Sequence, residues 1–169
     1  MTIETERLRL IPVSEEHTAF IFNHFTHEVT RYMMPEASKS MEDTRQVVRR
    51  FIMGWQNHTD YVWTITRKES GECLGLTGLH HAADPVPELG IWIKTAAHGH
   101  HYGREAIGGV MAHARSRGNH KLRYPVDRWN TASKKIPLFY GGRLVSGIRE
   151  MKTADGRILE EEVYEIPLH

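Results

Sequence analysis

The sequence has 169 residues but only one cysteine, Cys73, and no long apolar segment. A single cysteine cannot form a disulfide within the chain, which excludes a secreted scaffold held by disulfides. The apolar stretches fall far short of the roughly 20 residues that a membrane helix needs. The N-terminal residues include two acids, Glu4 and Glu6, and lack the apolar region of a signal peptide. We therefore expect a soluble, cytoplasmic protein without a membrane partner.

A dominant charge of one sign is also missing, because 22 Lys and Arg balance 21 Asp and Glu to a net charge of +1. Affinity for nucleic acid comes from many phosphate contacts, so this balance predicts no nucleic-acid partner. Hydrophobic residues make up 40% of the chain, which excludes a disordered protein. The length fits a single domain spanning residues 1–169.

Apolar periodicity predicts a mixture of strands and helices. Helical spacing follows Ser14 and Ser40, precedes Gly118, and begins again at Asn130. The predicted strands are residues 7–12, 61–66, 73–79, 88–93, 122–126, 144–150 and 158–168. This order favours an α+β fold, in which a largely antiparallel, twisted sheet of about six or seven strands is flanked by about four helices.

A loop rich in glycine and histidine, residues 98–103, joins a predicted strand to a predicted helix. The first turn of a helix has unpaired N–H groups, and the helix dipole favours negative charge there. Gly99 and Gly103 allow a close backbone approach. The loop is therefore a candidate anion site, with a simple tight turn as the alternative. It contains neither a G-x-x-x-x-G-K-[ST] nor a G-x-G-x-x-G motif.

Four segments in fixed order resemble the GNAT acyl-CoA-dependent N-acetyltransferases, especially the RimJ/RimL branch that acetylates the N-termini of ribosomal proteins. The segments are Thr5–Leu10, Glu88–Ile93, Tyr102–Ala106 and Asn130–Ser133. The resemblance covers nearly the whole chain. It implies the GNAT fold, acetyl-CoA as co-substrate and, among the possible assemblies, a homodimer.

The resemblance also implies how acetyl-CoA binds. The strand containing Ile91, Trp92 and Ile93 would splay from its neighbour and pair with the pantetheine amides. Asn130 would contact the cofactor arm, and Ser133 would lie near the thioester sulfur. The pyrophosphate would be held by the loop residues His98, Gly99, His100, His101, Tyr102, Gly103 and Arg104.

The chain departs from the family pattern at several positions. His98, His101 and Gly103 stand where the family prefers Arg or Gln, then Gly, then Gly or Ala. We expect His98 to donate to phosphate and His101 to keep a negative φ unless the loop is altered. Pro137 occupies the position where many relatives have a tyrosine acid, and Tyr140, one helical turn later, is expected in the core.

Acetyl transfer to an amine needs a proton acceptor, a donor for the oxyanion and, in many enzymes, an acid for the leaving thiolate. Glu88 is the leading candidate for the base, with a solvated carboxylate at a strand end as the alternative, and Glu150 is a weaker candidate. Ser133 is the candidate near the sulfur, although it also suits a helix start. Cys73 is expected to be a small buried side chain rather than a nucleophile.

The 12 histidines raise the question of a metal site. Zinc would need three or four converging ligands, and no H-E-x-x-H motif occurs, so we expect scattered histidines and no metal. The resemblance to the GNAT family implies transfer of an acetyl group from acetyl-CoA to a primary amine, either a protein N-terminus or a small amine, by direct attack on the thioester. The alternative is a non-catalytic acyl-CoA-binding protein that regulates or binds a partner, as suggested by the substituted loop and the missing tyrosine.

Overall fold

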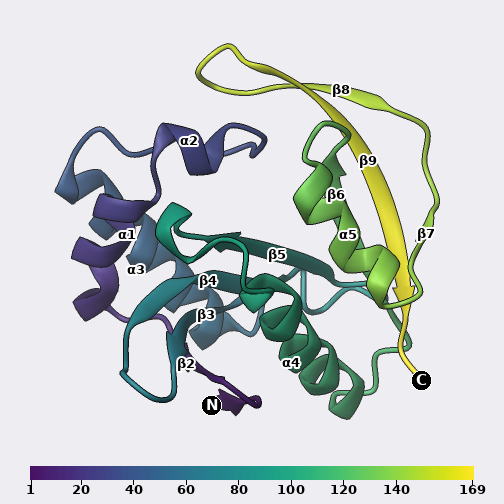
Figure 1. Cartoon of the computed structure of the whole chain (residues 1–169), viewed down its shortest axis with the longest axis horizontal. Helices are drawn as coiled ribbons and strands as arrows, with labels where there is room; N and C mark the ends of the chain where they lie inside the picture. The colour runs from purple at the N-terminus through teal and green to yellow at the C-terminus, as the bar shows by residue number, and fades with distance from the viewer.

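A computed structural model describes all residues from 1 to 169 and contains one twisted sheet with helices on both faces (Figure 1). Its strands are β1 (Ile3–Glu4), β2 (Leu8–Pro12), β3 (Tyr61–Arg67), β4 (Cys73–His80), β5 (Glu88–Ile93), β6 (Lys121–Asp127), β7 (Arg143–Leu144), β8 (Arg149–Lys152) and β9 (Ile158–Pro167). The α-helices are α1 (Thr18–His24), α2 (His27–Thr30), α3 (Met41–Asn57), α4 (Tyr102–Ser116) and α5 (Thr131–Phe139).

The strand order is β1-β2-β3-β4-β5-β6-β9-β7, and β8 pairs with β9. Every pairing is antiparallel except that of β5 with β6, which is parallel. The α+β class and the largely antiparallel sheet are therefore confirmed. The sheet has nine strands rather than seven, because β1 was not predicted and one predicted strand is divided in two.

Two predicted elements have different boundaries in the structure. The helix expected after Ser14 stops at His24, because the Thr26 side chain accepts a hydrogen bond from the Val29 N–H at 3.3 Å and starts a separate helix. The strand expected at 144–150 is divided into β7 and β8. Between them, Ser146 Oγ accepts a hydrogen bond from Val163 N, so a side chain replaces part of the regular ladder.

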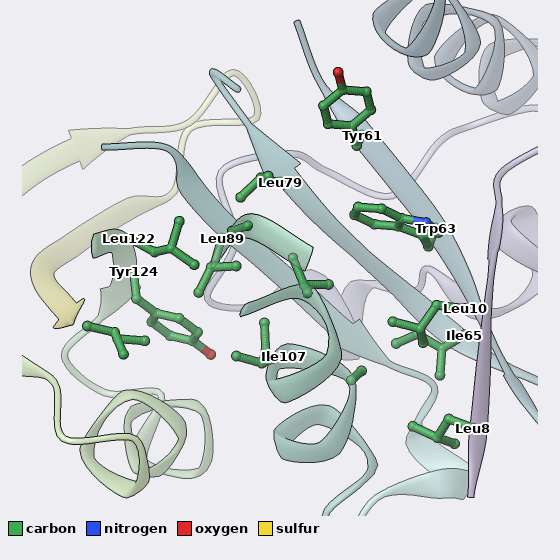
Figure 2. Packing of buried hydrophobic residues seen from close by; sticks show 14 of the residues in the cluster. Leu8, Leu10, Tyr61, Trp63, Ile65, Leu79, Leu89, Ile107, Leu122 and Tyr124 are labelled. Atoms are coloured by element: carbon green, nitrogen blue, oxygen red, sulfur yellow. The ribbon is translucent and has the colours of Figure 1, made fainter. Parts of the chain in front are cut away.

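Each face of the sheet has its own hydrophobic core. Helix α4 packs its apolar stripe on one face, and Figure 2 shows Ile107 of α4 facing Leu89 of β5 and Tyr124 of β6. Helices α1 and α3 cover the other face, where Trp92 packs in a smaller cluster with Val48 and Ile21. Strand β5 thus contributes alternate side chains to both cores, which holds it firmly in the middle of the molecule.

Local signals mark the start of α3 and the end of α4. Ser40 Oγ accepts from the Asp43 N–H at 3.1 Å at the start of α3. Gly118, with a φ of 94°, follows the last turn of α4 as the sequence predicted.

His17 makes the stability of this fold depend on pH. Its ring is 8% exposed, and Nδ1 accepts from Ser14 N at 3.1 Å and lies 2.8 Å from Thr64 Oγ1. Burial lowers the pKa of His17 in the folded chain. At pH values below the ordinary pKa of histidine, the unfolded chain therefore binds a proton that the folded chain does not. The contribution of neutral, buried His17 to the free energy of unfolding is complete above about pH 6.5 and is lost as the pH falls. We expect His17→Gln to reduce the loss of unfolding free energy between pH 7.5 and 5.5, measured by urea denaturation.

The exposed His120 supplies the control for this measurement, since His120→Gln should leave the pH dependence as in the wild type. A wild-type pH dependence in the His17 variant would contradict this account. The partly buried His113 adds a contribution of the same sign, because burial lowers its pKa as well.

Candidate active site

Strands β5 and β6 pair at one position only, Glu88 with Arg123, and then separate. The Arg123 N–H donates to Pro87 O at 2.8 Å. Along a strand, the N–H groups of every second residue point to the same neighbouring strand. After Arg123, the next N–H of β6 that could point toward β5 would therefore come from position 125. That residue is Pro125, which has no N–H. The ladder therefore stops, and β5 has a free edge beyond its first residues.

The free edge of β5 presents the backbone of Ile91 and Ile93. Trp92 pairs with Leu76 of β4, and the Lys94 N–H likewise donates to Leu74 O of β4 at 2.8 Å. By alternation, the N–H and C=O groups of Ile91 and Ile93 point to the opened side. The Trp92 ring packs against Phe20 and Phe25 on the far face. Of the three residues predicted to face a cofactor arm, Trp92 thus has both its backbone and its ring directed elsewhere.

Two residues of the loop between β5 and α4 have a left-handed backbone conformation. Gly99 has a φ of 88° and His101 a φ of 60°. The prediction of a negative φ for His101 is therefore wrong. This exposed histidine adopts a left-handed conformation at the N-cap position of α4. Such a conformation costs roughly 1–3 kcal/mol in a residue other than glycine. The His101 side chain makes no capping hydrogen bond, so no side chain caps the first turn of α4.

His98 does not point freely into the loop. Its Nε2 lies 2.6 Å from Ile93 O, and since a carbonyl only accepts, Nε2 is the donor. The expectation that His98 donates to phosphate is therefore not met by this nitrogen. The bond instead ties the loop back to the end of β5.

An ion pair between an exposed arginine and a partly buried glutamate anchors the loop from the N-terminal segment. Arg7 Nη2 donates to His100 O at 2.9 Å, and Arg7 Nε contacts Glu105 Oε2 at 2.6 Å. Thr5 Oγ1 donates to the other Glu105 oxygen at 2.6 Å. Burial opposes ionisation of Glu105, but the hydrogen bonds from Thr5 and Arg7 outweigh it and lower its pKa. The Tyr102 ring lies between the guanidinium groups of Arg7 and Arg67, whose centres are 4.6 and 5.6 Å from the ring centroid.

Across the opening, α5 brings Asn130 and Ser133 next to β6. Asn130 Oδ1 accepts from Ser133 N at 3.3 Å and so caps α5. Ser133 Oγ lies 2.7 Å from the hydroxyl of Tyr124, which is 2% exposed. Burial raises the pKa of Tyr124, which keeps the phenol protonated. The sequence pattern identified Tyr124 only as an alternating strand residue, because its partner is distant in the helix that follows.

Tyr140 packs as predicted, against the core formed by α4. Its hydroxyl donates to Arg104 O at 2.6 Å, and it occupies the space where Gly108 lacks a side chain. Burial raises the pKa of Tyr140. Its role is to join α5 to α4 across the end of the opening.

Glu88 lies half-buried at the start of β5, on the same face of the sheet as Trp92. On that face the β8–β9 hairpin reaches over to α2 (Figure 1). Arg157 at its tip donates to Thr30 O at 2.6 Å and to Arg31 O at 3.1 Å. Glu150, the weaker candidate base, lies exposed on β8 opposite Glu160 of β9.

The remaining candidates have simple surroundings. Cys73 is half-buried at the start of β4, and burial raises the pKa of its thiol. No three side chains among His, Cys, Asp and Glu converge in an arrangement that would hold a metal ion. No helix combines the length and the apolar character required to cross a bilayer.

Comparisons with known proteins agree with this geometry. An uncharacterised N-acetyltransferase, YoaA of Bacillus subtilis (strain 168), is 27% identical over 97% of this chain and 95% of its own length. The Salmonella typhimurium acetyltransferase that modifies the N-terminal serine of ribosomal protein L7/L12 superposes with a TM-score of 0.87, with 16% identity and full coverage of both chains. RimL, a ribosomal L7/L12 α-N-protein acetyltransferase solved with coenzyme A, gives a TM-score of 0.86 at 18% identity over 99% of this chain and 98% of its own.

The family model described as an acetyltransferase (GNAT) domain matches residues 7–143, from the strand that carries Arg7 through the loop, the opened strands and α5. This match spans most of the chain and includes every predicted cofactor-binding residue. The chain therefore belongs to the GNAT acetyltransferase family.

Proposed function

We propose that this protein transfers an acetyl group from acetyl-CoA to a primary amine, either a protein N-terminus or a small amine. The observation that carries the proposal is the free edge of β5 directly before the uncapped start of α4. A helix start without a capping side chain suits a pyrophosphate, because its N–H groups and dipole both favour an anion. The edge of β5 suits an amide-bearing arm, which can add to a sheet like an extra strand.

The donor site would be built from three parts. The N–H groups between Gly99 and Arg104 would bind the pyrophosphate, while Arg7 and Glu105 hold this loop in place. The backbone of Ile91 and the N–H of Ile93 would pair with the pantetheine arm, since Ile93 O already accepts from His98. Asn130, whose side chain caps α5, would form the opposite wall of the opening. RimL, which has a similar fold, was solved with coenzyme A, and this supports the choice of donor.

The transfer would need no covalent enzyme intermediate. A backbone N–H on the free edge of β5, near Ile91, would donate to the thioester oxygen as it gains negative charge. The leaving thiolate would take a proton from the hydrogen-bonded pair of Ser133 and Tyr124. Glu88, on the face opposite α4, would meet the amine and remove a proton from its cationic form.

The proposal is tested with acetyl-CoA and a panel of amines. We expect calorimetry to show binding of acetyl-CoA, and a thiol assay to show release of CoA with at least one acceptor. The panel should include peptides with a free N-terminal serine, which the neighbours acetylate, and small primary amines. Binding without turnover on any acceptor would favour the non-catalytic alternative. No binding would refute both.

Gly103→Pro should weaken acetyl-CoA binding by roughly 10- to 100-fold. Proline is tolerated in the first helical turn but removes one N–H, and a hydrogen bond to a charged group contributes about 1.5–3 kcal/mol. A Cβ at Gly103 would meet nothing closer than 3.4 Å. The matched control is Glu42→Pro, at the equivalent second position of α3. Equal affinities in both variants, measured by calorimetry, would show that the loop does not hold the pyrophosphate.

Ser133→Ala should lower kcat by about 100-fold while leaving the Kd of acetyl-CoA nearly unchanged. The variant retains the backbone N–H that Asn130 caps but removes the hydroxyl next to Tyr124, and positioned proton transfer contributes about 10² or more to rate. Ser116→Ala, at the exposed end of α4, is the control. A normal kcat in Ser133→Ala would remove Ser133 from the reaction.

A further inference from the structure

His80 and Asp60 form a hydrogen-bonded pair on the face of the sheet that carries Glu88. His80 is the last residue of β4, and Asp60 immediately precedes β3. His80 Nδ1 lies 3.1 Å from Asp60 Oδ1, and the same oxygen accepts from the His81 N–H at 3.3 Å. The predicted strand ended at residue 79, one position before His80. The structure instead makes it a half-buried strand residue, directly opposite Glu88 in the β4–β5 ladder.

Two glycines leave room for the His80 ring. A Cβ on Gly78 would lie 2.6 Å from His80 Nε2, and a Cβ on Gly90 would lie 2.9 Å from the same atom. The ring therefore occupies the space over both glycines, and Nε2 lies over the pair that Gly78 of β4 forms with Gly90 of β5. Gly90 directly precedes Ile91, whose backbone faces the opening. His80 Nε2 thus lies above the strand on which the thioester arm would bind.

The pair with Asp60 determines which nitrogen of His80 is free. A carboxylate only accepts hydrogen bonds, so Nδ1 carries the proton and Nε2 has an available lone pair. No hydrogen bond within the chain occupies Nε2. An imidazole held through Nδ1 by a carboxylate, with Nε2 open, is oriented to accept a proton and is stabilised once it becomes cationic.

The overall reaction requires that the nitrogen lose two protons. An alkylamine is a cation at neutral pH, since its pKa is about 10.4. The balance is RNH₃⁺ + acetyl–S–CoA → RNH–acetyl + HS–CoA + H⁺. The N–C bond forms and the C–S bond breaks. One proton must leave before attack, and the second must leave the nitrogen after the new bond has begun to form.

We propose that His80, positioned by Asp60, accepts the second proton through Nε2, after Glu88 has accepted the first. Directly opposed residues of an antiparallel pair have Cβ atoms only about 5 Å apart, so both groups can reach one nitrogen in succession. Both protons pass to solvent, while the thiolate takes one from the Ser133–Tyr124 pair, which is then reprotonated by solvent. One proton is released overall. This assignment rests on the proposed acetyl transfer.

His80→Asn separates this role from a structural one. The asparagine Nδ2 can replace His80 Nδ1 as donor to Asp60 and so retain the link between β4 and the α3–β3 turn, but it offers no base in place of Nε2. We expect kcat/KM for the best acceptor of the panel to fall about 100-fold at pH 7.5. The Kd of acetyl-CoA and the Tm should stay near wild type. The control is His81→Asn, because His81 is exposed and has a φ of 52°, which asparagine tolerates.

Asp60→Asn provides a second test with a different readout. Loss of the carboxylate removes the charge that stabilises the imidazolium, so kcat for the best acceptor should fall while KM and the Kd of acetyl-CoA stay near wild type. If the wild type releases CoA and His80→Asn behaves like His81→Asn, the assignment of His80 is wrong and the proposed function stands. If the wild type acetylates no acceptor, both fail.

Discussion

The opening between β5 and β6 is the constraint on which the rest of the site depends. A sheet gains hydrogen bonds by closing every ladder, so two strands that separate inside a sheet leave backbone groups that need partners. Here the strands separate after one pair, beside a proline that has no N–H to donate. The free backbone of β5 persists because its side chains are held in hydrophobic cores on both faces. The molecule therefore presents a strand edge that a ligand with amide groups can complete.

The other parts of the site are arranged around that opening. The loop after β5 turns at once into α4, so the free edge and the helix start are adjacent in space. Arg7 and Glu105, 98 positions apart in sequence, make contact and hold the loop from the far side. Helix α5 borders the opening. Asn130 caps its first turn, and Ser133 contacts Tyr124 of β6. Tyr140, directly after the helix, donates to Arg104 O of α4. The loop and α5 are thus tied together by hydrogen bonds, while the opposite face of the sheet carries the half-buried Glu88 of β5 and His80 of β4.

The departures from the family pattern alter side chains more than backbone. His101, which stands where the family prefers glycine, adopts a left-handed conformation with a φ of 60°, at some cost in strain. Pro137 prevents a tyrosine at its position, yet a buried tyrosine from β6 lies against Ser133 from the other side. A buried phenol thus lies beside Ser133, supplied by a different element of the chain.

The amino-acid sequence alone determined the fold class, most element boundaries and the family, because alternation, helical spacing and glycine positions are local and lie in contiguous segments. It also located the loop before α4, where turn chemistry is again local. Only the tertiary structure decided which way Trp92 and His98 point and that Tyr124 meets Ser133. It alone brought Asp60 and His80 together beside Glu88. These contacts join residues from separate elements, and their distances depend on strand register and on the space left by Gly78 and Gly90, which no local pattern encodes.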